Sequence, residues 1–160
     1  FIAESEYDYG SGKLVKNDDA QKVKPEPRQI LCSYSLLAKF RSFIREEDIA
    51  SKLYNELKRV NLLMDEMSVP SIHVAPGACG SYVVGDEDFM NKLLESSNRK
   101  LRGLEMEGYG LYMAGHMLNQ EYILIKGIAD FADGSKNDKF HTTCSYGSAW
   151  LVAQYIKKML

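Results

Sequence analysis

The strongest constraint on the fold is the segment Tyr122–Ile128, which is apolar along nearly its whole length. A run of this kind is typical of a strand buried on both faces, as the central strands of a parallel sheet are. Shorter strand patterns at 71–75 and 101–105 precede it, and helical patterns at 86–95 and 107–118 alternate with them. Strands and helices that alternate in this way predict an α/β fold.

The first half of the chain has a different organisation. Residues 1–4 have the pattern of the end of a strand, and residues 5–29 that of a loop or β-hairpin, because prolines near the end of this stretch exclude a long helix. Apolar residues then recur at helical spacing over 31–43 and again over 47–63. We expect these two helices to face the core or a second subunit. A closing helix is expected at 143–160.

Length and charge exclude several classes of function. The chain has 160 residues, which suffice for one domain with a core of its own. Its 20 basic and 22 acidic side chains give a net charge of −2, without the basic footprint of a nucleic-acid or anionic-membrane binder. No apolar run approaches the roughly 20 residues that span a bilayer, and the first residues lack a signal-peptide pattern. We therefore expect no nucleic-acid partner and no membrane association.

Cysteines and histidines show no disulfide or metal pattern. Cys32, Cys79 and Cys144 are widely spaced, odd in number and outside any CxxC motif, and the three histidines share no metal-ligand spacing. We expect three reduced thiols in a cytoplasmic protein, with no metal and no organic cofactor.

Two carboxylates stand out in the second half of the chain. Glu107 follows the 101–105 strand pattern, and Asp130 follows the strand predicted at Tyr122–Ile128. We expect both at the carboxyl ends of neighbouring strands, where open α/β sheets bind ligands. Glu107 is suited to accept hydrogen bonds from a vicinal diol, or else to stabilise a helix amino terminus. Asp130 is suited to act as a general acid, or else to form an ordinary turn.

A glycine-containing stretch separates two of these elements. Pro76 bounds the 71–75 strand pattern, and a tight loop is expected over 76–81. Residues 77–85 contain three glycines but lack the ending of a P-loop and the order of a dinucleotide fingerprint. We expect this loop to bring backbone amides close to a flat ligand.

Three segments together resemble the nucleoside phosphorylase-I superfamily, and within it the methylthioadenosine/S-adenosylhomocysteine nucleosidase branch. Residues 77–84 are similar to the family's small-Ser-Gly-x-x-Val-Val loop. Residues 104–108 are similar to its Met-Glu ribose motif, and residues 126–134 to its Ile-Ser-Asp-x-Ala-Asp segment. Residues 1–13 resemble a stretch after the family's central strand. The resemblance implies a three-layer α/β/α fold with a mixed, mostly parallel central sheet whose amino-terminal strands are missing. Residues 1–160 would then be one nucleosidase-like domain, as its carboxyl-terminal portion.

The resemblance also implies roles for particular residues. Glu107 would hold the ribose hydroxyls, with Met106 packed under the sugar and Glu105 supporting the sugar site. Asp130 would donate a proton to N7 of the purine and so improve the leaving group. Ala129 departs from the pattern, because the family commonly has a serine there that orients the acid.

The base would be held by backbone of Val83 and Val84 at its edge and covered by Phe131. The expected activity is hydrolysis of the N-glycosidic bond of an adenine nucleoside or nucleotide, which releases adenine, in a homodimer. Three alternatives stay open: phosphorolysis of a purine nucleoside, a non-catalytic module of a larger protein that senses nucleosides, and an oligomerisation domain of a larger protein.

Overall fold

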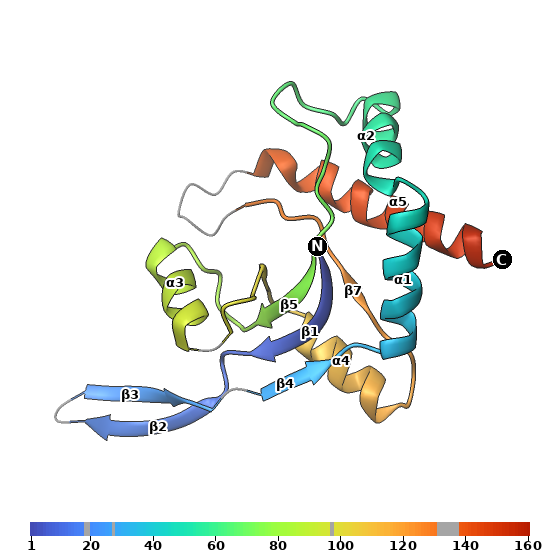
Figure 1. The fold of residues 1–160 in the computed structure, drawn as a ribbon. Coiled ribbons are helices and arrows are strands. Elements are labelled where there is room, and N and C mark those ends of the chain that lie inside the picture. The colour runs from blue at the N-terminus through green and yellow to red at the C-terminus, as the bar shows by residue number, and fades with distance from the viewer. Residues whose placement is uncertain (18–19, 27, 97, 131–137) are drawn as a thin grey trace.

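A computed structural model describes residues 1–17, 20–26, 28–96, 98–130 and 138–160 (Figure 1). Within these residues, five strands form a mixed central sheet. Strands β1, β5 and β6 run parallel in this order, whereas β4 and β7 are antiparallel to β1. The bounds are β1 (Ile2–Asp8), β4 (Arg28–Leu31), β5 (Val74–Cys79), β6 (Gly103–Glu105) and β7 (Leu124–Ile125). A mixed, mostly parallel sheet is confirmed.

Helices lie on both faces of this sheet, which gives the expected three layers (Figure 1). One face, where Tyr7 and Ala78 are buried, is covered by α3. The other face is covered by α4 together with α1 and α5, and α2 packs against α1 and α5. The bounds are α1 (Tyr34–Glu46), α2 (Ile49–Arg59), α3 (Glu87–Ser96), α4 (Gly108–Met117) and α5 (His141–Met159), which a short 3₁₀ turn at Asp138–Phe140 precedes.

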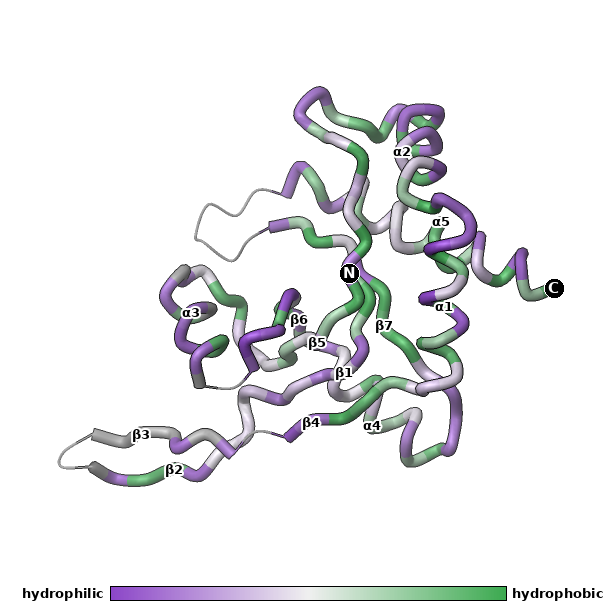
Figure 2. Tube along the Cα trace, viewed as in Figure 1, coloured by the Kyte–Doolittle hydropathy of each residue, from purple (hydrophilic) through white to green (hydrophobic). Residues whose placement is uncertain are grey.

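The main core lies between the sheet and the helices α1, α4 and α5. Phe40 on α1 stacks on Tyr155 of α5, with ring centroids 3.8 Å apart, and Phe43 meets the same ring edge-on at 5.5 Å. Ile2 at the start of β1 is fully buried in this cluster. Figure 2 shows hydrophobic colours along the start of β1 and along β7, whereas much of α3 is hydrophilic.

Most of the local predictions are confirmed. Of the segment 5–29, expected to be a loop or β-hairpin, the middle is a hairpin of β2 (Gly12–Asn17) and β3 (Ala20–Pro25), which projects from the sheet (Figure 1). Its first residues were wrongly predicted, because β1 continues to Asp8 through pairing with β4 and β5. The expected helices at 31–43 and 47–63 are α1 and α2, separated at Asp48, whose φ of 47° interrupts the helical backbone. Asn119, with φ of 52°, ends α4 as a left-handed residue.

The tight loop expected over 76–81 was wrong, because residues 76–79 belong to β5. Pro76 lies where the register between β1 and β5 shifts, so its missing N–H removes no regular ladder bond. Its carbonyl still accepts a hydrogen bond from the Arg102 N–H at 3.1 Å. A proline at an irregular position therefore did not end the strand.

The expectation of a long central parallel strand at 122–128 was also wrong. Only β7, two residues long, pairs with β1, and it does so antiparallel. The rest of this edge of β1 is already paired with β4. Beyond β7 the chain turns onto α5, where the Gly127 N–H donates to Ser148 Oγ at 2.7 Å. The segment is apolar because it is partly buried between these elements, not because strands flank it.

The Tyr112 hydroxyl joins β1 to β7, and its loss gives a test of this sheet edge. The hydroxyl donates to the Ala3 carbonyl at 2.6 Å and accepts from the Leu124 N–H at 3.0 Å, and the side chain is fully buried. Tyr112→Phe leaves both backbone groups without this partner, so we expect a loss of about 1–3 kcal/mol in the free energy of unfolding by urea. Tyr155→Phe is the control, because Tyr155 is also buried and packs through its ring. Equal losses in the two variants would contradict the bridging role.

Candidate active site

The carboxyl ends of β5 and β6 meet at one edge of the sheet. Cys79 is paired with Glu105, and the Gly80 N–H donates to the Glu105 carbonyl at 3.1 Å. The segment that carries Val83 and Val84 leaves β5 here, and Met106 and Glu107 leave β6. The structure thus places these predicted residues at the same edge, where 70% of Val83 and 45% of Met106 are exposed.

The buried Glu105 carboxylate holds the start of α4. It accepts hydrogen bonds from the Glu107 N–H at 2.8 Å and from the Gly108 N–H at 2.7 and 2.8 Å. These N–H groups belong to the first turn, which lacks partners within the helix. Glu107 occupies the N-cap position, but its side chain makes no capping hydrogen bond. Capping is therefore the role of Glu105, and the Glu107 carboxylate is available for another one.

An ion pair holds that exposed Glu107 carboxylate. Lys126 Nζ lies 2.7 Å from Glu107 Oε2 and 3.6 Å from Glu105 Oε2. The hydrogen bond from Lys126 lowers the pKa of Glu107, so this side chain is a carboxylate at neutral pH. Burial lowers the pKa of Lys126, but the hydrogen bond to Glu107 and the charge of Glu105 outweigh it and raise the pKa overall.

Sequence reasoning gave Lys126 no role, although it lies inside a segment that carried the resemblance. The available signal was its position as the basic residue within the apolar run Tyr122–Ile128. A cation in such a run has to leave the core or meet a buried acid. In the structure it meets both Glu105 and Glu107.

Asp130 is placed differently from the prediction. The strands that precede Glu107 and Asp130 are not neighbours, because β6 pairs with β5 and β7 pairs with β1. Their directions also differ, since β7 is antiparallel to β1. The link between the two segments is Lys126, four residues before Asp130, which reaches across to Glu107. Asp130 is partly buried, and Phe131, expected to cover the base, lies outside the described residues.

A second buried acid, Glu6 on β1, lies behind this edge. Its side chain is fully buried, and neither carboxyl oxygen has a hydrogen-bond partner among the described residues. Burial, followed by the charge of Glu105, raises the pKa of Glu6 to about 8, although Lys126 opposes the shift. Glu6 is therefore a neutral acid at pH 7. Sequence reasoning missed Glu6 because residues 5–29 were expected to form a loop or β-hairpin, whereas β1 continues to Asp8.

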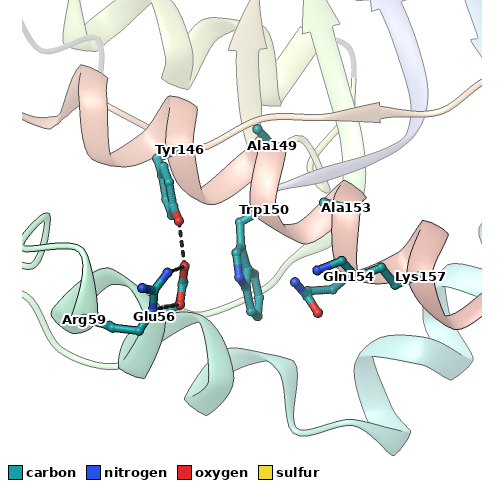
Figure 3. A pocket seen from close by; sticks show the side chains of 8 residues that line it. All are labelled: Glu56, Arg59, Tyr146, Ala149, Trp150, Ala153, Gln154 and Lys157. Carbon is teal, nitrogen blue, oxygen red and sulfur yellow. Dashed lines mark hydrogen bonds and ion pairs between the residues drawn. The ribbon is translucent and has the colours of Figure 1, made fainter.

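A surface groove of about 500 Å³ lies elsewhere, between α2 and α5 (Figure 3). Two of its charged groups already bind one another: Arg59 holds Glu56 through two contacts of 2.7 Å, and the Tyr146 hydroxyl donates to Glu56 at 2.6 Å. Trp150 stands beside them (Figure 3). The predicted site residues do not line this groove. The sheet edge, where the Glu107 carboxylate is exposed, is therefore separate from this groove.

Two further properties concern the described part of the chain. No group of three or more His, Cys, Asp or Glu side chains there is arranged to hold a metal ion. No helix in the same residues is long and apolar enough to cross a membrane. His141, to which we assigned no role, has its Nε2 atom 3.4 Å from Oδ1 of Asp138, one turn earlier in the chain.

The raised pKa of Glu6 predicts how stability depends on pH. The folded protein keeps the Glu6 proton up to about pH 8, whereas the unfolded chain releases it near pH 4.5. Between these values the folded state binds more protons, so this group makes stability fall as pH rises. Glu6→Gln removes this contribution. We expect its free energy of unfolding, relative to the wild type, to rise by a few kcal/mol between about pH 5 and about pH 8.5. A difference that does not change with pH in urea titrations would contradict the assignment.

Comparison with known proteins finds nucleosidases that are similar to this chain in sequence or in fold. No model of a known protein family matches it. It is 28% identical over 157 residues to an uncharacterized protein of Sinorhizobium fredii, and this alignment covers 96% of the chain and 37% of that protein. It is 26% identical over 145 residues to ATP nucleosidase Cap17 of Escherichia coli, and this alignment covers 85% of the chain and 28% of that protein. The chain thus spans only about a third of the length of these relatives.

A solved structure gives the comparison of folds. The S-adenosylhomocysteine nucleosidase of Streptococcus pyogenes, in complex with 5-methylthiotubericidin, matches with a TM-score of 0.65 at 14% sequence identity. The match covers 99% of this chain and 59% of that chain. The chain therefore has the fold of the methylthioadenosine/S-adenosylhomocysteine nucleosidases, which is the nucleoside phosphorylase-I fold that its three segments resemble.

Proposed function

We propose that this chain is part of a purine nucleosidase that hydrolyses the N-glycosidic bond of an adenine nucleoside or nucleotide and releases adenine. The observation that carries the proposal is the Glu107 carboxylate. It is exposed at the carboxyl edge of β6, ionised, paired with Lys126 and not used to cap α4. The sequence likeness to an ATP nucleosidase and the shared fold support the same reaction.

The chemistry of glycosidic cleavage requires groups at two places. Positive charge develops on the sugar, and negative charge develops on the departing base, so each half of the transition state needs its own partner. Glu107 accepts hydrogen bonds from the ribose hydroxyls, and Lys126 keeps it ionised and in place. Asp130 donates its proton to N7 of the purine, so that the base leaves as a neutral molecule.

The remaining predicted residues surround the ligand. Met106 packs under the sugar, and Glu105 holds the start of α4 so that Glu107 is correctly placed. Backbone groups of Val83 and Val84 meet the edge of the base, and Phe131 covers it. We further propose that the protein acts as a homodimer in the cytoplasm and that residues 1–160 are one portion of a nucleosidase-like domain. Exposed apolar side chains of α5, among them Val152 and Ile156, support a contact between subunits.

The nucleophile decides between hydrolysis and phosphorolysis. Assays of the full-length protein with adenosine, methylthioadenosine and ATP, each with and without phosphate, distinguish the two by chromatography of the products. We expect adenine without added phosphate and a free sugar product. A sugar phosphate would instead establish a phosphorylase. Saturable binding of a substrate without release of adenine would establish a sensing module. Ala129 favours this last alternative, because a serine is common at this position in the family.

Asp130→Asn tests the general acid. The amide cannot donate a proton to N7 in the same way, so we expect adenine release to fall by about 10²–10⁴-fold with little change in melting temperature. Asp65→Asn is the matched control, because Asp65 is an exposed aspartate in the segment after α2. An active Asp130→Asn protein would exclude Asp130 as the acid.

Glu107→Gln tests the ribose contact. Replacing the carboxylate removes charge-assisted hydrogen bonds worth about 1.5–3 kcal/mol, so kcat/KM should fall roughly 10–100-fold. Glu66→Gln is the control, since Glu66 is also exposed and also paired with a lysine, Lys139. To confirm that the sugar hydroxyls are concerned, 2′-deoxyadenosine is compared with adenosine. A Glu107→Gln protein that still prefers adenosine to the same degree would contradict the assignment.

A further inference from the structure

The buried carboxyl of Glu6 occupies a space that two glycines leave open. A Cβ atom at Gly77 on β5 would lie 2.4 Å from Glu6 Oε1, and one at Gly108 on α4 would lie 2.9 Å from Glu6 Cδ. The same Cβ at Gly108 would lie 2.8 Å from Glu105 Oε1. Glu6 and Glu105 therefore approach Gly108 from two strands. The side chain is held in place by backbone, although no described residue satisfies its oxygens.

The Lys126 ammonium lies close to two carboxylates, Glu105 and Glu107, and acts on the carboxyl of Glu6 through its charge. Of the charged groups in the described residues, Glu105 and Lys126 act on Glu6, and Lys126 also binds Glu107. The other titratable groups that face Glu6 are the Cys79 thiol on β5 and the Tyr112 phenol on α4. Burial raises the pKa of Cys79 to about 12 and raises that of Tyr112 as well, so both are uncharged near pH 8.

The charge of Glu6 therefore decides how Lys126 is shared. While Glu6 is neutral, Lys126 has two carboxylates to balance and lies closer to the exposed one, at 2.7 Å from Glu107 against 3.6 Å from Glu105. If Glu6 gives its proton to solvent, two buried carboxylates stand side by side at Gly108. Their combined field in a poorly hydrated interior exceeds that of a solvent-exposed carboxylate, so the ammonium is drawn inward.

We propose that Glu6 is a positioning residue of the nucleosidase site: in its neutral form it leaves Lys126 on Glu107, and in its ionised form it withdraws Lys126 from Glu107. The inference rests on the proposed function, because it assigns Glu107 to the ribose hydroxyls. Glu107 is 71% exposed, and its ion pair with Lys126 is what anchors it. Without this anchor the carboxylate samples several rotamers, and the preorganisation of the sugar site is lost.

The pH profile of the full-length protein tests this role. The variants are Glu6→Gln, which has the shape of the neutral acid and cannot ionise, and Glu4→Gln as the control. Glu4 lies on the same strand, but it is partly exposed and paired with Arg41. The readout is kcat/KM for adenine release from the most active of the three adenine substrates, between about pH 7 and about pH 9.5.

We expect kcat/KM of the wild type and of Glu4→Gln to fall by about an order of magnitude above pH 8, as expected for loss of one proton from the free enzyme. In Glu6→Gln, kcat/KM relative to the variant's own value at pH 7 should lack the fall. Two results would overturn the proposal: an alkaline fall in Glu6→Gln equal to that of the wild type, or a folded Glu6→Gln protein that is inactive at pH 7.

A double-mutant cycle separates this proposal from the proposed function, because it needs no activity. Lys126→Met and Glu107→Gln are combined, and their coupling in the free energy of unfolding is measured near pH 7 and pH 9.5. The coupling should decline at the higher pH in the wild-type background and persist in the Glu6→Gln background. If Glu6→Gln does not fold, the Lys126–Glu107 coupling measured with Glu6 present is sufficient for the test. A coupling that is the same at pH 7 and pH 9.5 would then overturn the proposal. Absence of adenine release by the wild type would refute the nucleosidase function and leave this result standing.

Discussion

Strand β1 is the element on which the placement of the others depends, because it has hydrogen-bonded neighbours along both edges. One edge pairs with β5 through six residues, and the other is divided between β4 and β7. The Tyr112 hydroxyl bonds to both β1 and β7, and so ties α4 to the sheet at the same place. The division of this edge limits β7 to two residues and releases the following chain toward α5. As a result, Lys126 emerges where it can reach the end of β6.

The site at that edge is an arrangement of acids around one lysine. Glu105 uses its carboxylate on the first N–H groups of α4, which leaves Glu107 free of the capping role common at helix amino termini. Lys126 then connects the segment after β7 with the segment after β6. Behind them, the buried carboxyl of Glu6 is under the charge of both Glu105 and Lys126. On the proposed assignment of Glu107 to the ribose hydroxyls, the placement of this carboxylate and the titration of Glu6 on β1 are physically linked.

Local patterns predicted the parts of the fold that depend on local interactions. Sequence patterns predicted all five described helices within a few residues of their ends. Helical spacing of apolar residues identified α1, α2 and α4, since burial of one face imposes this periodicity. Two prolines near residue 25 correctly excluded a long helix in this segment, which contains the β2–β3 hairpin. The apolar run at Tyr122–Ile128 was misread, because apolarity reports that a segment is buried and does not report which strand it meets. Pro76 was misread for a related reason: whether its missing N–H matters depends on the register of a partner strand.

The sequence by itself determined the α/β class, the segments that resemble a nucleosidase, and the carboxylates at Glu105 and Glu107 as neighbours at the end of one strand. Their motif is contiguous, so no long-range contact was needed to bring them together. Only the tertiary structure decided that Lys126 pairs with Glu107 and that β7 does not lie beside β6. It also decided that Glu6 is buried against two glycines and so retains its proton at neutral pH. Each of these depends on residues distant in the chain, and desolvation and charge coupling arise only when folding brings such residues together.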